Sequence, residues 1–193
     1  MARVEIKRLH IERFRGIENL SWNPAPGFNL VIGGGDCGKT TLLEAIGLLF
    51  HPGNSVTLNE ADYFERKTED GFSIEAVIAV ADGFDLSSAT KTYWPWEWDG
   101  TNAVQPQVDL EIAPDVQVPV FRVLVSANSD FDLSWEIIQP NDNHSHFSVG
   151  SRRRIGVVKL TGEDKNDRDL RLVYGSALES DSKLILIDFK LLR

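Results

Sequence analysis

The sequence predicts an α/β fold in which a buried strand leads through a glycine-rich loop into a buried helix. Residues 28–32 form a short, almost wholly apolar run, which is typical of a buried strand. Residues 33–38 contain four glycines and therefore favour an irregular loop. Residues 39–50 are apolar around most of a helical surface, so they predict a buried helix of about three turns. The segment His51-Pro52-Gly53-Asn54 ends that helix.

An antiparallel pair of strands precedes this unit. In residues 4–14 the apolar side chains recur at the spacing of the buried side of a strand, with one irregularity. Residues 17–22 have the character of a second short strand. We expect the two strands to be joined by a turn near Arg15 and Gly16.

The remainder of the chain predicts mainly β-structure. Alternating segments follow at residues 72–80, 118–125, 133–138, 155–160 and 183–189. Prolines and turns rich in Asp, Asn and Gly separate them. We therefore expect a single domain over residues 1–193, with an α/β core over residues 1–80 and a β-rich antiparallel remainder over residues 81–193.

The charge of the chain argues against a broad nucleic-acid-binding surface. The net charge is −9, whereas a domain that grips DNA by neutralising phosphates usually carries a basic patch. Arg152, Arg153 and Arg154 form a local basic cluster, which we interpret as a solvated strand edge. If the protein acts on nucleic acid, we expect most of the phosphate contacts to be made by other parts of the assembly.

The sequence shows no membrane-spanning or secretory signal, and we therefore expect a cytoplasmic location. No apolar run approaches the roughly 18 residues that span a bilayer, so no membrane partner is expected. The N-terminal residues alternate charged and β-branched types and lack the apolar stretch of a signal peptide. A single cysteine leaves no internal disulfide framework and no cysteine metal cluster.

Residues 33–40 carry the chemistry that the sequence shows most clearly. They read Gly-Gly-Gly-Asp-Cys-Gly-Lys-Thr and satisfy the Walker A pattern G-x-x-x-x-G-K-[ST]. Glycines at 33 and 38 let the backbone curl so that its N–H groups converge on a polyphosphate. Lys39 places a positive charge on the β- and γ-phosphates, and Thr40 supplies a hydroxyl ligand for Mg²⁺. The following helix directs free N–H groups and its positive dipole end at the same anions.

Chance is a poor explanation for this motif. The pattern arises at on the order of 1 in 10⁴ positions or fewer, and here it lies between a predicted strand and a predicted helix, as phosphate binding requires. We expect ATP and Mg²⁺ as ligands, with Thr40 on the metal. The residues expected to contact the nucleotide are Gly33, Gly34, Gly35, Asp36, Cys37, Gly38, Lys39, Thr40 and Thr41.

Three other features admit a functional and a structural interpretation. Cys37 lies at a helix N-terminus, where its pKa could be lowered and a redox role would follow. Because the variable loop positions tolerate small residues, we prefer the interpretation that Cys37 has no chemical role. His144 and His146 alternate in an Asn- and Asp-rich loop and are interpreted as exposed loop histidines in preference to a metal pair. The tryptophans of residues 94–98 favour an aromatic hairpin packed on the sheet over a recognition platform.

The first eighty residues resemble the start of an ABC-type ATPase head of the RecF, SMC and OLD (overcoming lysogenization defect) group. The resembling features are Phe14-Arg15-Gly16 at the end of the first strand, the strand at 17–22, Val31-Ile32 before the loop, and residues 41–46 after it. The resemblance implies that Arg15 approaches the bound nucleotide. Residues 152–158 and 165–171 look like the OLD-family ATP-dependent endonucleases, which the chain resembles most.

The chain departs from that group at several places. Gly35 stands where the family usually has Asn. No Ser-Gly signature is found. Residues 183–188 resemble a Walker B strand, which would make Asp188 a Mg²⁺-site residue, but Phe189 replaces the usual catalytic glutamate. The Toprim nuclease domain of OLD proteins is absent from the sequence, and catalytic residues stay unassigned.

The resemblance implies the N-terminal part of an ABC-type ATPase head, with ATP and Mg²⁺ bound by the loop and Arg15 assisting. The expected function is the ATP-binding domain of an OLD-like, DNA-associated ATPase or endonuclease without its nuclease domain. Its full activity would need missing elements or a partner, such as a second copy or a partner ATPase or nuclease chain, and DNA would be reached through that assembly. The first alternative is a nucleotide-dependent binding or scaffolding module with little hydrolysis of its own. A small phosphotransferase ranks last.

Overall fold

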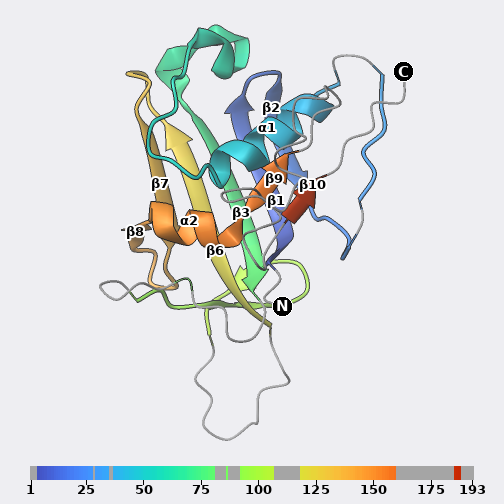
Figure 1. The fold of residues 1–193 in the computed structure, drawn as a ribbon, viewed down its shortest axis with the longest axis vertical. Coiled ribbons are helices and arrows are strands. Elements are labelled where there is room, and N and C mark those ends of the chain that lie inside the picture. Colours follow the sequence, from blue (N-terminus) through green and yellow to red (C-terminus); the bar gives the residue numbers. More distant parts are fainter. Residues whose placement is uncertain are drawn as a thin grey trace, which may run out of the picture.

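The computed structural model describes residues 4–27, 29–34, 37–80, 86, 92–106, 118–159 and 185–187. Its main element is an eight-stranded antiparallel sheet, with the long helix α1 (Lys39–Leu49) across one face (Figure 1). We call the face under α1 the inner face and the opposite one the outer face. The predicted mixed α/β fold with an antiparallel sheet is confirmed, and strands from both sides of residue 80 form one sheet.

Most of the predicted strands are present. Across the sheet lie β2 (Ile17–Trp22), β1 (Val4–Phe14), β3 (Phe72–Val80) and β6 (Val118–Ala127). The far edge of β6 is shared by two strands, β7 (Leu133–Ile138) and β4 (Trp96–Trp98). β8 (His144–His146) then pairs with β7, and β5 (Ala103–Val104) pairs with β4. The predicted turn between the first two strands is also confirmed, since Phe14 pairs with Ile17.

The alternation of side chains builds the core on the inner face. Because successive residues of a strand point to opposite faces, one set is buried under α1 and the other faces outward. Fully buried members of the inner set are Leu9 and Ile11 of β1, Ile74 and Ile78 of β3, and Val123 and Val125 of β6. The irregularity expected in the first strand is a register shift between Ile6 and Arg8.

Helix α1 forms as predicted and closes this core. Its buried residues are Leu42, Leu43, Ala45, Ile46, Leu48 and Leu49. The indole Nε1 of Trp135 on β7 donates a hydrogen bond to the carbonyl of Leu48 at 3.0 Å, which ties the last turn of the helix to the sheet. Within the described residues, no helix combines the length and the hydrophobicity needed to cross a bilayer.

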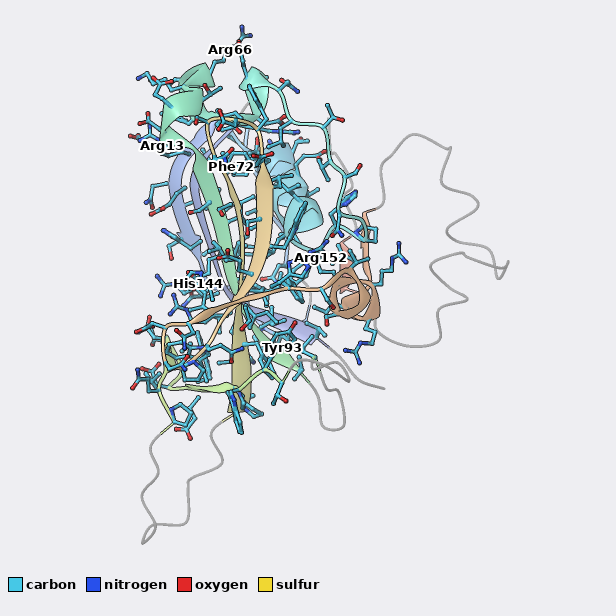
Figure 2. All side chains as sticks on the ribbon, turned by 90° about the vertical axis from the view of Figure 1, so that its left-hand side faces the viewer. Arg13, Arg66, Phe72, Tyr93, His144 and Arg152 are labelled. Carbon is cyan, nitrogen blue, oxygen red and sulfur yellow. The ribbon has the colours of Figure 1, made fainter. Side chains whose placement is uncertain are left out.

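Three short 3-10 helices connect α1 to β3 at one end of the sheet. They are η1 (Glu60–Asp62), η2 (Phe64–Arg66) and η3 (Thr68–Asp70). Tyr63 between the first two is buried, packs edge-on against Phe72 and donates its hydroxyl to Asn128 O at 2.6 Å. Arg13 and Arg66 lie at this same end, as Figure 2 shows.

The predicted buried strand at residues 28–32 is wrong over the described residues 29–32. Leu30 and Ile32 expose 63% and 80% of their surface, and only Val31 packs against the core. An apolar strand is buried on both faces only where other strands flank it and helices cover it. No described strand pairs with residues 29–32. The local pattern therefore predicted an environment that the described part of the chain does not supply.

The prediction for residues 155–160 is partly wrong as well. A short helix, α2 (Val149–Ile155), occupies the basic cluster, and the strand β9 covers only Val157–Lys159. Ser148 caps the helix, because its hydroxyl accepts from the backbone N–H of Ser151 at 3.1 Å. β9 pairs in parallel with β10 (Ile185–Ile187), which is the described part of the strand predicted at residues 183–189.

Candidate phosphate-binding site

The candidate site lies at the N-terminus of α1. Gly33, Gly34, Cys37 and Gly38 of the loop are described, whereas Gly35 and Asp36 lie outside the described residues. Gly38 adopts φ of 82°, a left-handed conformation that L side chains rarely adopt. A Cβ there would also lie 3.5 Å from Cγ1 of Ile17, so the β1–β2 hairpin packs directly against the loop.

The start of α1 presents backbone donors without a side-chain cap. The first helical hydrogen bond runs from Leu42 N to Gly38 O at 2.9 Å, and no side chain caps Gly38. The N–H groups of Lys39, Thr40 and Thr41 therefore have no acceptor inside the helix, as at every α-helix start. The first turn also carries no acidic residue. This end of the helix is both rich in donors and electrically positive, which suits an anion.

The Lys39 ammonium lies inside the loop. Its Nζ donates to Gly33 O at 2.8 Å, to Gly34 O and to the Sγ of Cys37 at 3.2 Å. Among the described residues no carboxylate pairs with it. The positive charge is therefore held by neutral carbonyls, which are weaker acceptors than phosphate oxygens.

The same ammonium changes the chemistry of Cys37. The thiol is exposed, and its hydrogen bond with Lys39 lowers the pKa of Cys37 below the usual 9.0. The sequence suggested a lowered pKa from the helix N-terminus, whereas the main cause is the lysine two residues away. Gly33 faces the same thiol, because a Cβ at Gly33 would come within 2.5 Å of the Cys37 Sγ.

Arg15 is held by a carboxylate that the sequence analysis did not identify. Its Nε and Nη2 lie 2.9 Å from Oδ1 of Asp62, and its backbone N–H donates to Asp62 O at 3.0 Å. The buried Asp62 also accepts from Asn59 N at 2.9 Å. The missed signal is the pair Asn59 and Asp62, a capping box at the start of η1. The Ile17–Gly38 contact brings the hairpin of Arg15 to the loop, while the described contacts of the guanidinium are with Asp62 and with the ring of Phe14.

The remaining sequence candidates divide as follows. Asp188 lies outside the described residues. His144 and His146 are exposed, as expected, but in strand β8 and not in a loop. Nδ1 of His144 lies 2.5 Å from Oε2 of Glu136, and within the described part of the chain no three His, Cys, Asp or Glu side chains gather as metal ligands.

The basic cluster lies on helix α2 and not on a strand edge; Arg153 and Arg154 are exposed, as predicted, whereas Arg152 is not. Arg152 is fully buried on α2, with its guanidinium 4.4 Å from the Trp135 ring (Figure 2). Its four hydrogen bonds, of 2.6 to 2.9 Å, go to the carbonyls of His51, Gly53 and Phe147 and to Oδ1 of Asn54. The reason is electrostatic, because the carbonyl oxygens of the segment after α1 and of Phe147 all turn toward the guanidinium.

The aromatic cluster is a hairpin packed on the sheet, as preferred from the sequence. Trp96 of β4 is buried on the outer face, and Trp98 is half-buried beside it. Trp94 is different, since 66% of its surface is exposed.

Comparison with known proteins agrees with these features. Residues 5–167 match a family described as the AAA ATPase domain. Curated relatives include DNA replication and repair proteins RecF. That of Erwinia tasmaniensis is 40% identical over 77 residues, which are 40% of this chain and 21% of the relative, and that of Shewanella baltica is 35% identical over 80 residues, or 42% and 22%. The chain thus spans about a fifth of the length of these relatives.

A solved RecF–ATP structure shares the fold. It superposes with a TM-score of 0.51 at 17% identity, over 83% of this chain and 33% of the solved chain. The likeness supports an ABC-type, P-loop ATPase fold of the RecF kind. Since the family match covers most of the residues and includes the whole loop from Gly33 to Thr40, the chain belongs to the AAA ATPase domain family.

Proposed function

We propose that this chain binds ATP with Mg²⁺ through residues 33–41, as the nucleotide-binding part of a DNA-associated ATPase. One observation carries the proposal: a Walker A lysine sits inside its loop, in front of an uncapped helix N-terminus. The solved RecF–ATP structure supports the choice of ATP, and the RecF relatives, which are DNA replication and repair proteins, support a DNA-associated role.

Each loop residue has a physical role in this proposal. The backbone of Gly33, Gly34, Gly35, Asp36, Cys37 and Gly38 surrounds the phosphates. Lys39 exchanges its carbonyl acceptors for phosphate oxygens, which form shorter and stronger bonds with an ammonium. Thr40 ligates Mg²⁺ and Thr41 extends the donor set of the helix. Arg15 assists from the hairpin, and Asp188 is a further candidate for the metal site.

The finer assignment is an OLD-like ATPase that lacks its nuclease domain, with residues 1–193 as one partial ABC-type head. Its support is the resemblance of residues 152–158 and 165–171 to that subgroup. In this assignment the active unit is an assembly, formed with a second copy or with a partner ATPase or nuclease chain, and DNA binds to that assembly.

A second candidate is a module in which ATP shapes an interface and is barely hydrolysed. The observation that favours it is Phe189, which follows Asp188 where a catalytic glutamate is usual. Measuring ATP turnover by the purified chain distinguishes the two candidates. Turnover that Lys39→Ala removes supports an ATPase, and binding without turnover supports the module.

The binding proposal is tested by calorimetry with ATP and Mg²⁺ on wild type and Lys39→Ala. Losing a charge-assisted contact to phosphate is expected to weaken affinity by at least about tenfold. Lys67→Ala is the matched control, because it removes an exposed lysine that pairs with Glu65 away from the loop. Unchanged affinity in Lys39→Ala would show that the loop does not hold the nucleotide.

A further inference from the structure

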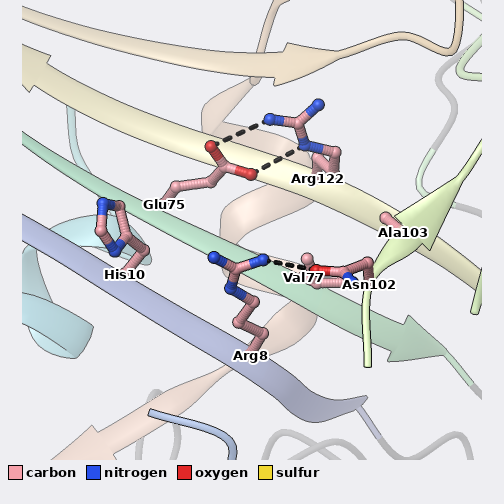
Figure 3. Close-up of a pocket in the computed structure, with 7 residues that line it drawn as sticks. All are labelled: Arg8, His10, Glu75, Val77, Asn102, Ala103 and Arg122. Carbon is pink, nitrogen blue, oxygen red and sulfur yellow. Dashed lines mark hydrogen bonds and ion pairs between the residues drawn. The ribbon is translucent and has the colours of Figure 1, made fainter. Parts of the chain in front are cut away.

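The outer face of the sheet carries a second polar pocket, on the side away from α1. It has a volume of about 250 Å³ and is lined by Arg8, His10, Glu75, Val77, Asn102, Ala103 and Arg122 (Figure 3). None of these residues belongs to the phosphate-binding loop. They come from β1, β3, β6 and the β4–β5 hairpin.

Strand register brings the two arginines to the pocket. Arg8 pairs with Val77, and Val77 pairs with Arg122, so the three residues form one row across β1, β3 and β6. His10 and Glu75 form the next row. The arginines stand two strands apart, roughly 10 Å between backbones, so their side chains can reach one small ligand from both sides.

Both guanidinium groups are held in position. Nε and Nη2 of Arg122 donate to the carboxylate of Glu75 at 2.7 and 3.1 Å, and its guanidinium lies 5.0 Å from the Trp96 ring. Nη1 of Arg8 donates to Oδ1 of Asn102 at 2.8 Å. Arg8 has no carboxylate partner among the described residues, so its positive charge is not neutralised by a direct ion pair. An unpaired guanidinium in a small concave site attracts anions.

His10 lies at the edge of the pocket. Its Nε2 lies 3.1 Å from Oε1 of Glu12, while its Nδ1 is buried and has no hydrogen-bond partner within the described part of the structure. The charged donors that line the pocket are therefore the guanidinium groups of Arg8 and Arg122. A phosphate monoester, whose second pKa is near 6, offers several anionic oxygens to such a pair of guanidinium groups.

We propose that this pocket binds a phosphate monoester or inorganic phosphate, separately from the loop at α1. Tetrahedral phosphate offers oxygens in several directions, and the guanidinium groups of Arg8 and Arg122 approach the pocket from different strands. A carboxylate offers two coplanar oxygens and matches this arrangement less well. The same chemistry occurs in a free phosphate and in the 5′-phosphate end of a nucleic-acid strand.

The test follows backbone amide signals by NMR while inorganic phosphate is titrated into Lys39→Ala, which weakens the competing loop. Asn102 and Ala103 report on the pocket, whereas Gly38 and Thr40 report on the loop. Saturable shifts at the pocket that Arg8→Gln weakens by at least about tenfold support the proposal. Arg66→Gln, an exposed arginine at the η-helix end, is the matched control for net charge and should leave them unchanged.

Two oligonucleotides distinguish the sources of the phosphate. The strands are identical except that one has a 5′-phosphate and the other a 5′-hydroxyl. Selective binding of the phosphorylated strand assigns the pocket to a strand end, and binding of inorganic phosphate alone assigns it to a free phosphate. Two results would overturn the proposal: shifts confined to the loop, or unchanged phosphate affinity in Arg8→Gln. If Arg8→Gln does not fold, Arg8→Lys replaces it, because lysine keeps the positive charge but lacks the paired N–H donors of the guanidinium.

Discussion

At the residue scale, Arg152 illustrates how a charge can be buried without a counter-charge. Burial lowers the pKa of Arg152 to about 10, so the side chain is still protonated at neutral pH. Carbonyl dipoles after α1 and the Trp135 ring take the place of a carboxylate. The arginine thereby joins α2 and β7 to the end of α1, which lies far away in sequence.

Arg152→Ala is therefore expected to destabilise the protein by about 3–5 kcal/mol, because three carbonyls and an amide oxygen lose a buried donor. Arg153→Ala is the matched control. Its exposed side chain makes one hydrogen bond, to Pro52 O at 2.8 Å, and its loss should cost less than about 1 kcal/mol. Urea unfolding followed by tryptophan fluorescence measures both. Equal effects of the two variants would contradict this account of Arg152.

The sequence could identify residues whose chemistry is local and not those whose partners are distant. Lys39 and Gly38 were predictable because the motif and the loop conformation are contained in eight neighbouring residues. Arg152 could not be predicted, because three of its four acceptors lie about a hundred positions away. The partner of Arg15 is also distant, and only the capping pattern at Asn59 and Asp62 gave a local sign of it.

At the element scale, strand alternation predicted the sheet well. The apolar run at residues 28–32 failed because burial of a whole strand depends on its neighbours, which the run itself does not encode. The helix over the basic cluster was missed for a related reason. Its seven residues are too few to show a clear helical period, and its stability comes from the Ser148 cap and from the docking of Arg152.

The environment of residues 29–32 can be checked by comparing two leucines. Leu49→Ala removes a fully buried side chain from α1 and should cost about 2–5 kcal/mol. Leu30→Ala, at a position that is 63% exposed, should cost less than about 1 kcal/mol. Urea denaturation of each variant against wild type provides the measurement. A large cost for Leu30→Ala would restore the buried strand predicted from the sequence.

The β7–β8 pair predicts part of the acid sensitivity of the protein. The hydrogen bond from His144 lowers the pKa of Glu136 below its usual 4.5, with a smaller contribution from Ser134. A carboxyl with a depressed folded-state pKa adds stability above about pH 4.5, and this stability is lost as the pH falls through the folded value.

Glu136→Gln should therefore lose less stability than wild type as the pH falls from 5 to 3. Melting temperatures measured from pH 7 to pH 3 test this. Glu18→Gln, on the exposed edge strand β2, removes one carboxylate in the same way and is the matched control. Parallel pH profiles for wild type and Glu136→Gln would exclude a contribution from this pair.

At the scale of the whole molecule, the two faces of the sheet have separate chemistry. The inner face buries α1 and presents the loop at the start of that helix, whereas the outer face carries paired charges and the Trp96 hairpin. The chain as a whole covers about a fifth of the RecF relatives. The loop geometry of the described residues bears on nucleotide binding, and turnover has to be measured separately.

Binding and hydrolysis can be separated in one thermal experiment. A ligand that binds only the folded state at 100 times its dissociation constant adds about 2.7 kcal/mol, which raises the Tm of a domain of this size by roughly 5–10 °C. We expect ATP with Mg²⁺ to produce this shift in wild type and to produce little or none in Lys39→Ala. If the chain alone hydrolyses ATP slowly, the shift should persist over hours and match that of a non-hydrolysable analogue. A shift that decays with ATP while the analogue's shift remains would show that these 193 residues already contain a working ATPase.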